Sequence, residues 1–408
     1  MKRSINPETV AVRVSKDALR NIRKGHPWVF ENSVIFLSKD GSPGDIAVIF
    51  DEKKRFVAAG LFDPFSMIRI RILQFGKPAA IDESWFREKI SNAFMTRENF
   101  IPQNTDGYRL IYGENDGLPG LIIDVYGGSS VIKIYSLCWI PYLEMLSGLL
   151  VEILNSKRVV LRMSEQCSKN KEHLKDFEDG MVLSGEKPDV PVIFSENGIF
   201  FESDIERGQK TGFFLDQRDN RSRVEKLADK KKVLNVFSYS GGFSLYAARG
   251  GAESVTNIDI SSYAVEAVSR NIALNVNNPK ISSCRYVNLT GDAFETMEML
   301  IRKGEKFGMV IIDPPSFAKS EKHRKNALNA YAKLARLGFK LVEKESVFVM
   351  ASCSSRITVE EFSELIVQTA KKEKKNIALT EVTGHPSDHP VKIPEGRYLK
   401  CVFARVLS

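Results

Sequence analysis

The N-terminal part of the chain alternates apolar and polar positions over short runs, which predicts a small β-rich domain. Residues 47–50 and 56–59 are apolar runs on either side of a polar turn. Residues 67–73 alternate apolar and basic side chains with the period of two that marks a half-buried strand. Residues 16–24 have the spacing of a short helix, and residues 76–78, Gly-Lys-Pro, have the composition of a linker.

The middle of the chain mixes helical and strand periodicities, which predicts an α+β domain. Apolar side chains recur at helical spacing over residues 83–100 and 140–154. The predicted strands are 108–112, 121–126, 131–135 and 158–162. Residues 165–185 are rich in charge, and we expect a loop there.

Strands and helices alternate from residue 232 onward, which predicts βαβ units and a parallel sheet. The predicted strands are 233–237, 255–258, 309–312 and 347–350, and the predicted helices are 244–249, 263–275 and 328–341. The expected fold class is therefore α/β, a Rossmann-like and mostly parallel doubly wound sheet preceded by a small β-rich domain and an α+β middle domain. We expect these three domains at residues 1–78, 79–200 and 201–408.

A turn of small residues after the first of these strands has the chemistry of a nucleoside-binding loop. Gly241 and Gly242 let the backbone approach a ligand without a Cβ clash, although the turn lacks the dinucleotide fingerprint GxGxxG. Asp259 follows the next strand, 17 residues after Gly242, where a carboxylate accepts hydrogen bonds from a ribose. A glycine pair alone is equally consistent with a tight strand–helix connection, so Asp259 is what favours a nucleoside cofactor.

Two further acidic residues follow predicted strands. Asp292 suits either an adenine amino group, with Phe294 packing on the ring, or the N-cap of a helix. Asp313 precedes Pro314 and Pro315, which form a rigid exit without backbone donors. Because ligands of such sheets bind beyond the carboxyl ends of the strands, Asp313 can face a flat base in the cleft.

Cys353 follows the strand predicted beside that of Asp313. A thiolate at this edge can attack C6 of a pyrimidine and make C5 able to take a methyl group. A lone cysteine is more often a small buried apolar residue, but the position at the carboxyl edge of the sheet favours a nucleophile. We interpret the other four cysteines, Cys138, Cys167, Cys284 and Cys401, as structural.

Composition excludes several classes of protein. With 43% hydrophobic and 27% charged residues, the 408-residue chain has ordinary globular usage and is not disordered, collagen-like or disulfide-rich. The sequence has no CxxC pair, and we expect no metal. No apolar stretch approaches the roughly 18–20 residues of a membrane span, and the N-terminus lacks the apolar segment of a secretory signal. We therefore expect a cytoplasmic protein with no membrane partner.

The net charge of +8 is unevenly distributed. Residues 1–80 carry 14 Lys and Arg against 8 Asp and Glu, so this segment accounts for +6 of the total. A basic N-terminal module on a nearly neutral body suits nucleic acid, although a solvated surface explains the charge equally well by itself.

These motifs, in this order, resemble the PUA-domain-containing class I methyltransferases that make 5-methylcytosine in the 23S RNA of the bacterial large ribosomal subunit. The resemblance covers nearly the whole chain. It rests on residues 25–30, 116–121, 208–221, 235–243, 313–315, 352–354, 388–390 and 394–400.

The resemblance implies a PUA RNA-binding domain, a middle domain and a Rossmann-like domain that binds S-adenosylmethionine, with large-subunit ribosomal RNA as the partner. The implied cofactor-binding residues are Phe214, Gln217, Arg218, Phe237, Ser238, Tyr239, Gly241, Gly242, Asp259, Ile260, Asp292, Ala293, Asp313 and Pro314. Gln217 and Arg218 would hold the methionine end, although a solvated helix start explains these two residues as well. Cys353 would be the nucleophile, and Asp313 would steady N3 and the amino group of cytosine.

The sequence departs from two related patterns at Ser316. Amino-group methyltransferases have an aromatic residue directly after the prolines, and another group of RNA cytosine methyltransferases has a second cysteine there. A single-cysteine scheme must therefore apply, and the base that removes the C5 proton stays unassigned. A guanine methyltransferase on the same scaffold, a non-catalytic RNA-binding assembly factor and a homodimer stay open.

Overall fold

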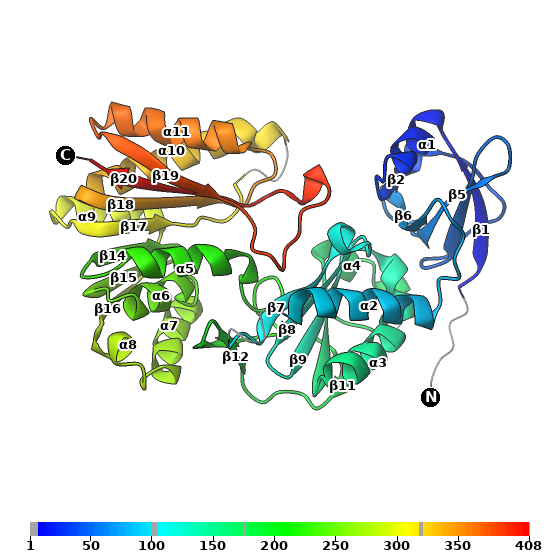
Figure 1. The fold of residues 1–408 in the computed structure, drawn as a ribbon, viewed down its shortest axis with the longest axis horizontal. Helices are drawn as coiled ribbons and strands as arrows, with labels where there is room; N and C mark the ends of the chain where they lie inside the picture. The colour runs from blue at the N-terminus through cyan, green and yellow to red at the C-terminus, as the bar shows by residue number, and fades with distance from the viewer. Residues whose placement is uncertain (1–6, 99–103, 175, 318–320, 408) are drawn as a thin grey trace. The chain divides into compact units, whose positions relative to one another are not determined.

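The computed structural model describes residues 7–98, 104–174, 176–317 and 321–407. The chain divides into two compact units (Figure 1). The first unit comprises Met1–Gly198, Ser203–Leu215 and Asp388–Ile393, and the second comprises Ile199–Glu202, Asp216–Ser387 and Pro394–Ser408.

Six short strands in the first unit form the β-rich domain that the alternating pattern predicts. Their order in the sheet is β2-β6-β5-β4-β1-β3, and β1 and β4 run parallel. The elements are β1 Thr9–Val14, α1 Lys16–Arg23, β2 Trp28–Phe30, β3 Val34–Leu37, β4 Ile46–Phe50, β5 Phe56–Phe62 and β6 Ile68–Phe75. Helix α1 begins at Ser15, whose hydroxyl accepts from the Ala18 N–H, and it buries Leu19 and Ile22.

A second sheet of the first unit has the order β11-β10-β9-β8-β7. Its strands are β7 Gly107–Tyr112, β8 Leu121–Tyr126, β9 Ser129–Ile134, β10 Arg158–Met163 and β11 Val182–Gly185. Helices α2, Glu83–Arg97, and α3, Leu143–Leu154, pack on it around a core that includes Trp139 and Phe86. The end of the helix predicted over 83–100 lies outside the described residues. The chain leaves this sheet through β12, Val192–Glu196, and β13, Ile199–Ser203.

Two expectations for this region are wrong: that no apolar stretch approaches the length of a membrane span, and that residues 165–185 form a loop. Leu137–Leu154 is long and apolar enough to cross a membrane, with a mean hydropathy of 1.6 over 18 residues. It consists of the 3₁₀ helix η4, Leu137–Tyr142, and α3, and more than half of it is buried, so core packing accounts for its apolar character. The predicted loop over 165–185 contains α4, Glu165–Ser168, and strand β11, because Ser164 caps the helix and β11 pairs with β10.

The second unit contains the predicted α/β domain. Its sheet has the order β16-β15-β14-β17-β18-β20-β19; the first five strands are parallel, and β20 and β19 join antiparallel. The strands are β14 Lys232–Val236, β15 Ser254–Asp259, β16 Arg285–Thr290, β17 Phe307–Ile312, β18 Val342–Ser352, β19 Ile377–Thr383 and β20 Lys400–Val406. The mostly parallel, doubly wound fold is therefore confirmed.

Helices cover both faces of this sheet (Figure 1). The helices are α5 Arg218–Leu227, α6 Gly242–Arg249, α7 Ser262–Leu274, α8 Pro279–Ser283, α9 Ala293–Arg302, α10 Arg324–Leu341 and α11 Val359–Lys372. In β14, Val233 packs in the cluster with α5, α6 and α8, whereas Leu234 packs in the cluster with α9, α10 and α11. Because successive side chains of a strand point to opposite faces, a buried strand of this kind reads as a continuous apolar run.

Candidate active site

The seven-stranded sheet has its switch point between β14 and β17. From β14 the chain moves outward through β15 and β16, and it then crosses back to β17 and β18 on the other side. Val236 of β14 lies opposite Ile312 of β17, so the residues after both strands leave the same edge. Ligands of doubly wound sheets bind in the crevice at such a point.

The turn after β14 has an uncommon backbone conformation. Phe237 and Tyr239 have φ angles of 61° and 47°, and Gly241 has a φ angle of 81° at the start of α6. The left-handed region costs energy for residues with side chains, so surrounding contacts must hold such a turn. One of them is the Tyr239 N–H, which donates to Asp259 Oδ2 at 2.8 Å.

The same turn contains two buried hydroxyls that lack a hydrogen-bond partner among the described residues, those of Ser238 and Ser240. Buried polar groups are normally paired, so these hydroxyls are available to a ligand. A Cβ at Gly241 would come within 3.0 Å of Val268 Cγ1, so only glycine leaves the backbone this close to α7.

Asp259 ends β15 and supports this turn. Its Oδ1 accepts from the Ser261 N–H at 3.0 Å, and its Oδ2 accepts from Tyr239. Because each carboxylate oxygen has two lone pairs, Asp259 keeps acceptor capacity for a ribose hydroxyl. The neighbouring Ile260 is 74% exposed and offers an apolar surface beside the turn.

Asp292 has the N-cap role that the sequence left open. Its Oδ1 accepts from the N–H groups of Phe294 and Glu295 at 2.9 and 3.1 Å, at the start of α9. Both hydrogen bonds of the cap go to Oδ1, so Oδ2 of this exposed residue can still accept hydrogen bonds. The side chain of Ala293 is buried in the core. The contact of Asp292 with an adenine stays a prediction.

Asp313 and Cys353 lie at the ends of neighbouring parallel strands, as the sequence predicts. Ile312 of β17 is opposite Met350 of β18, and Cys353 Sγ lies 3.8 Å from the carbonyl oxygen of Pro314. Cys353 is partly exposed, whereas the other four cysteines are buried. Burial raises the pKa of Cys138 to about 12 and that of Cys284 to about 11, so these two are thiols at neutral pH.

Sequence analysis missed a buried lysine at this edge. Lys400, the first residue of β20, is 2% exposed and lies opposite Ser352 in the sheet. Its ammonium group donates to the backbone carbonyls of Ser354 and Ile357. A charged residue directly before the apolar run 401–404 is the signal in the sequence that marks it.

Three expected cofactor-binding residues precede β14, and two of them, Gln217 and Arg218, are those expected at the methionine end. Gln217 and Arg218 lie in the second unit and are 3% and 2% exposed, so the alternative of a solvated helix start is wrong. Gln217 Oε1 accepts from Asn220 Nδ2 at 2.6 Å, at the start of α5. Phe214 lies in the first unit, where the Lys210 ammonium group is 4.4 Å from its ring centre. Their contacts with a cofactor stay predictions.

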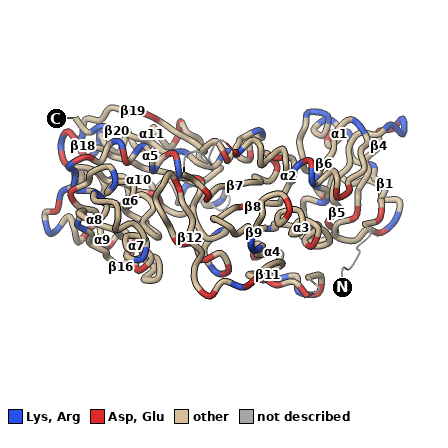
Figure 2. Tube along the Cα trace, turned by 60° about the horizontal axis from the view of Figure 1, so that its bottom comes forward, with Lys and Arg blue, Asp and Glu red and all other residues tan. Residues whose placement is uncertain are grey.

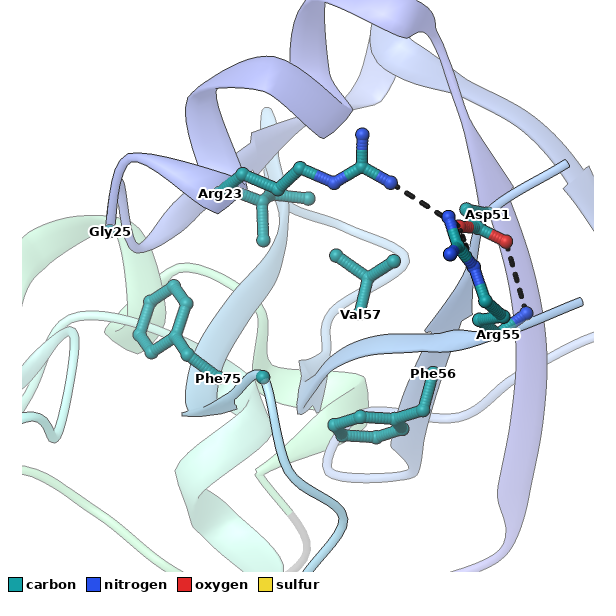
Figure 3. Close-up of a pocket in the computed structure, with 9 residues that line it drawn as sticks. Arg23, Gly25, Asp51, Arg55, Phe56, Val57 and Phe75 are labelled. Carbon is teal, nitrogen blue, oxygen red and sulfur yellow. Dashed lines mark hydrogen bonds and ion pairs between the residues drawn. The ribbon is translucent and has the colours of Figure 1, made fainter. Parts of the chain in front are cut away.

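The N-terminal domain contains a pocket lined by basic and aromatic residues (Figure 3). Figure 2 shows Lys and Arg on α1 and around β4 in this domain. Arg55 and Arg23 both contact Asp51, at 2.7 and 3.3 Å, and the hydrogen bond from Arg55 is the main reason that the pKa of Asp51 falls to about 2. Phe56 and Phe75 complete the pocket, which therefore combines cations with aromatic rings.

Comparison with known families gives two matches. Residues 173–397 match the family described as S-adenosylmethionine-dependent methyltransferase, and residues 12–75 match the PUA-like domain. The first match contains every expected site residue of the α/β domain, and the second contains the β-rich sheet apart from its first residues.

Individual relatives match over nearly their full lengths. The chain is 41% identical over 400 residues to "Ribosomal RNA large subunit methyltransferase" of Deinococcus radiodurans, covering 97% of each protein. It is 34% identical to "Ribosomal RNA large subunit methyltransferase I" of Aeromonas salmonicida, covering 97% of this chain and 99% of that protein. A crystal structure of SMU.776, described as a methyltransferase complexed with SAH, has the same fold, with a TM-score of 0.79, 21% identity and coverage of 98% and 100%.

Proposed function

Because this chain belongs to the family of S-adenosylmethionine-dependent methyltransferases, we propose that it transfers a methyl group from S-adenosylmethionine to C5 of a cytosine in large-subunit ribosomal RNA. The observation that carries the choice of base is the partly exposed Cys353 beside Asp313 at the carboxyl edge of the sheet. The names of the relatives from Deinococcus and Aeromonas support the choice of RNA.

The turn after β14 fits the cofactor. The unpaired hydroxyls of Ser238 and Ser240 offer hydrogen bonds to its polar groups, and Asp259 offers acceptor sites to its ribose. Asp292 and Ile260 stand on the loops that follow the next two strands and would border its base. When bound, the cofactor supplies a methyl group on a sulfonium, which is a strong electrophile.

Attack by the Cys353 thiolate would make C5 of cytosine nucleophilic enough to take a methyl group. C5 of cytosine is a weak nucleophile, and a bond from Cys353 Sγ to C6 moves electron density onto C5. After methylation, transfer of the C5 proton to a basic group and departure of the thiolate restore the aromatic ring. Asp313, directly after the neighbouring strand, would accept a hydrogen bond from the amino group and share a proton with N3 while the ring carries the extra density.

The PUA-like domain supplies RNA contacts. Its net positive charge favours phosphates independently of sequence, and Arg23, Arg55 and the two phenylalanines of its pocket suit a backbone and an unstacked base. The target cytosine must leave its stack to reach a thiol at the edge of a sheet. We expect this reaction in the cytoplasm, where ribosomes are assembled.

The experiment is methyl transfer to unmodified large-subunit ribosomal RNA with labelled S-adenosylmethionine, followed by digestion and mass spectrometry of the nucleosides. Labelled 5-methylcytidine is the expected product. A labelled guanosine would retain the enzyme and refute the covalent mechanism. If no label is transferred to naked RNA or to precursor particles while the cofactor binds, a non-catalytic RNA-binding role replaces the proposal.

A further inference from the structure

Lys400 lies beside the strand end and the turn that carry the proposed nucleophile. The antiparallel pairing of β20 with β18 places Lys400 opposite Ser352, the residue before Cys353. Its ammonium group donates to the carbonyls of Ser354 and Ile357, so it fastens the turn that follows the thiol. Lysine side chains are almost never this fully buried unless they are paired.

In the described part of the chain, no carboxylate forms a salt bridge with Lys400. Burial lowers the pKa of Lys400 to about 8, and the negative charge of a Cys353 thiolate acts in the opposite direction and raises it. Coupling between two sites is reciprocal, so an ammonium that gains from the thiolate stabilises that thiolate by the same free energy.

Among the residues that the structure describes, Tyr331, Asp313 and Arg324 are not available as cations to stabilise the thiolate. Tyr331 accepts a hydrogen bond from Ser352 at 3.0 Å, and burial holds its pKa far above neutral, so its hydroxyl is uncharged. A carboxylate at Asp313, directly after β17, would disfavour a second negative charge nearby. On the α10 and α11 side, Arg324 is paired with Glu361.

We propose that Lys400 is a positioning residue that keeps Cys353 as a reactive thiolate and fixes the turn that carries it. This proposal rests on the proposed function. When the C–S bond forms, the sulfur lone pair becomes the bond to C6 and the negative charge moves into the ring. When the thiolate leaves at the end, the electron pair returns to sulfur. The ammonium therefore favours the charged sulfur at the first and last steps.

A hydrogen-bonding role alone does not need a cation. Two backbone carbonyls are satisfied by any neutral donor, whereas desolvating an ammonium is costly. The positive charge has an additional use only toward an anion, and Cys353 is the anionic partner that acts on Lys400. This difference between donor and charge makes the proposal testable.

The test is the pH dependence of alkylation of Cys353 by iodoacetamide in the full-length protein, read by mass spectrometry of the Cys353 peptide. In the wild type, the rate should reach half its plateau at a lower pH than that of N-acetylcysteine in the same buffers. In Lys400→Met, the rate at pH 7 should fall about three- to tenfold while the plateau at high pH is retained, because thiolate fraction falls faster than nucleophilicity rises. Lys400→Arg should restore the wild-type profile.

Lys375→Met is the matched control. Lys375 is another partly buried lysine of the same unit, with a pKa that burial lowers, and it donates to the carbonyl of Val342 at 3.3 Å. Val342 begins β18, at the opposite end from Cys353, so this variant should leave the alkylation profile unchanged.

Two results would overturn the proposal. One is a wild-type midpoint at or above that of N-acetylcysteine, which needs no variant and decides the matter even if Lys400→Met does not fold. The other is slowing of Lys400→Met by one factor at every pH, which would mean that Lys400 only shapes the turn. Calorimetric binding of S-adenosylmethionine reports whether the variant is folded. No RNA enters this test, so failure of the cytosine assay and failure of this proposal are separate results.

Discussion

Two buried cations, one in each unit, are compensated in different ways. In the first unit Arg109 donates to both oxygens of Asp124 at 2.7 and 2.8 Å, and Thr211 donates to the same carboxylate. In the second unit Lys400 donates to two backbone carbonyls, and a negative charge on Cys353 would raise its pKa. The first pair is charge-balanced in the folded protein whatever the ligand state, whereas the second becomes balanced only when the thiol loses its proton.

The way in which each cation is compensated distinguishes a structural ion pair from a candidate functional group. Arg109 and Asp124 are 7% and 0% exposed and geometrically complete, so removing either leaves an isolated buried charge. Such a pair fixes structure. Burial lowers the pKa of Lys400 to about 8, and groups with such perturbed pKa values cluster at functional sites.

The largest effect should come from removing the proposed nucleophile, Cys353. Cys353→Ala should lower methyl transfer on the order of a thousandfold or more, since a covalent step has no substitute in the site. S-adenosylmethionine affinity, measured by calorimetry, should be unchanged because the thiol is not part of the turn after β14. Cys284→Ala, at a buried cysteine, is the control and should stay active. Loss of cofactor binding in Cys353→Ala would contradict the assignment.

The next largest effect should be a loss of stability when the buried ion pair of Arg109 and Asp124 is broken. Asp124→Asn keeps the shape of the side chain and leaves the guanidinium of Arg109 buried without its counter-charge. The free energy of unfolding of the first unit should fall by about 3–5 kcal/mol, measured by urea denaturation. A loss under about 1 kcal/mol would show that the pair is not the structural element that the comparison assumes.

The carboxyl edge of the seven-stranded sheet was largely predictable from the sequence, because strand–helix alternation is a local pattern. The ends of β14, β15, β17 and β18 follow from apolar runs, and parallel strands bring their carboxyl ends to one edge. The order of these strands then placed Asp313 and Cys353 beside each other. The cap formed by Asp292 was also available as an alternative, because Asp is a favoured N-cap residue.

Other features of the site depend on contacts that are distant in the sequence. Lys400 was missed because its role requires β20 to turn antiparallel beside β18. The positive φ angles of Phe237 and Tyr239 were missed because left-handed backbone is typical of Gly and Asn, not of aromatic residues. In the N-terminal sheet, alternation predicted a half-buried strand over 67–73, but it did not indicate that Arg71 is 4% exposed and donates to the Ile68 carbonyl at 2.8 Å.

A moderate effect should appear at Asp259, whose carboxylate accepts two backbone hydrogen bonds and can accept more. In Asp259→Asn, the amide nitrogen must face one of two N–H donors, those of Tyr239 and Ser261, and a ribose acceptor is lost. We expect S-adenosylmethionine to bind about tenfold more weakly, or about 1.4 kcal/mol, by calorimetry. The melting temperature of the free protein should be measured in parallel. Unchanged affinity would remove Asp259 from the cofactor site.

The smallest effect should come from an ion pair that is partly exposed and lies outside the proposed site. Arg223 and Glu381, in the second unit, are 34% and 47% exposed and 2.8 Å apart. Glu381→Gln keeps the shape of the side chain and should change the free energy of unfolding by about 0.2–1 kcal/mol, an effect that 1 M salt abolishes. A loss as large as that of Asp124→Asn would mean that burial does not rank these pairs. The contrast between Arg109 and Lys400 would then have to rest on titration of the partner alone, because a carboxylate is charged at neutral pH in either setting and a thiol is charged only where a cation holds it so.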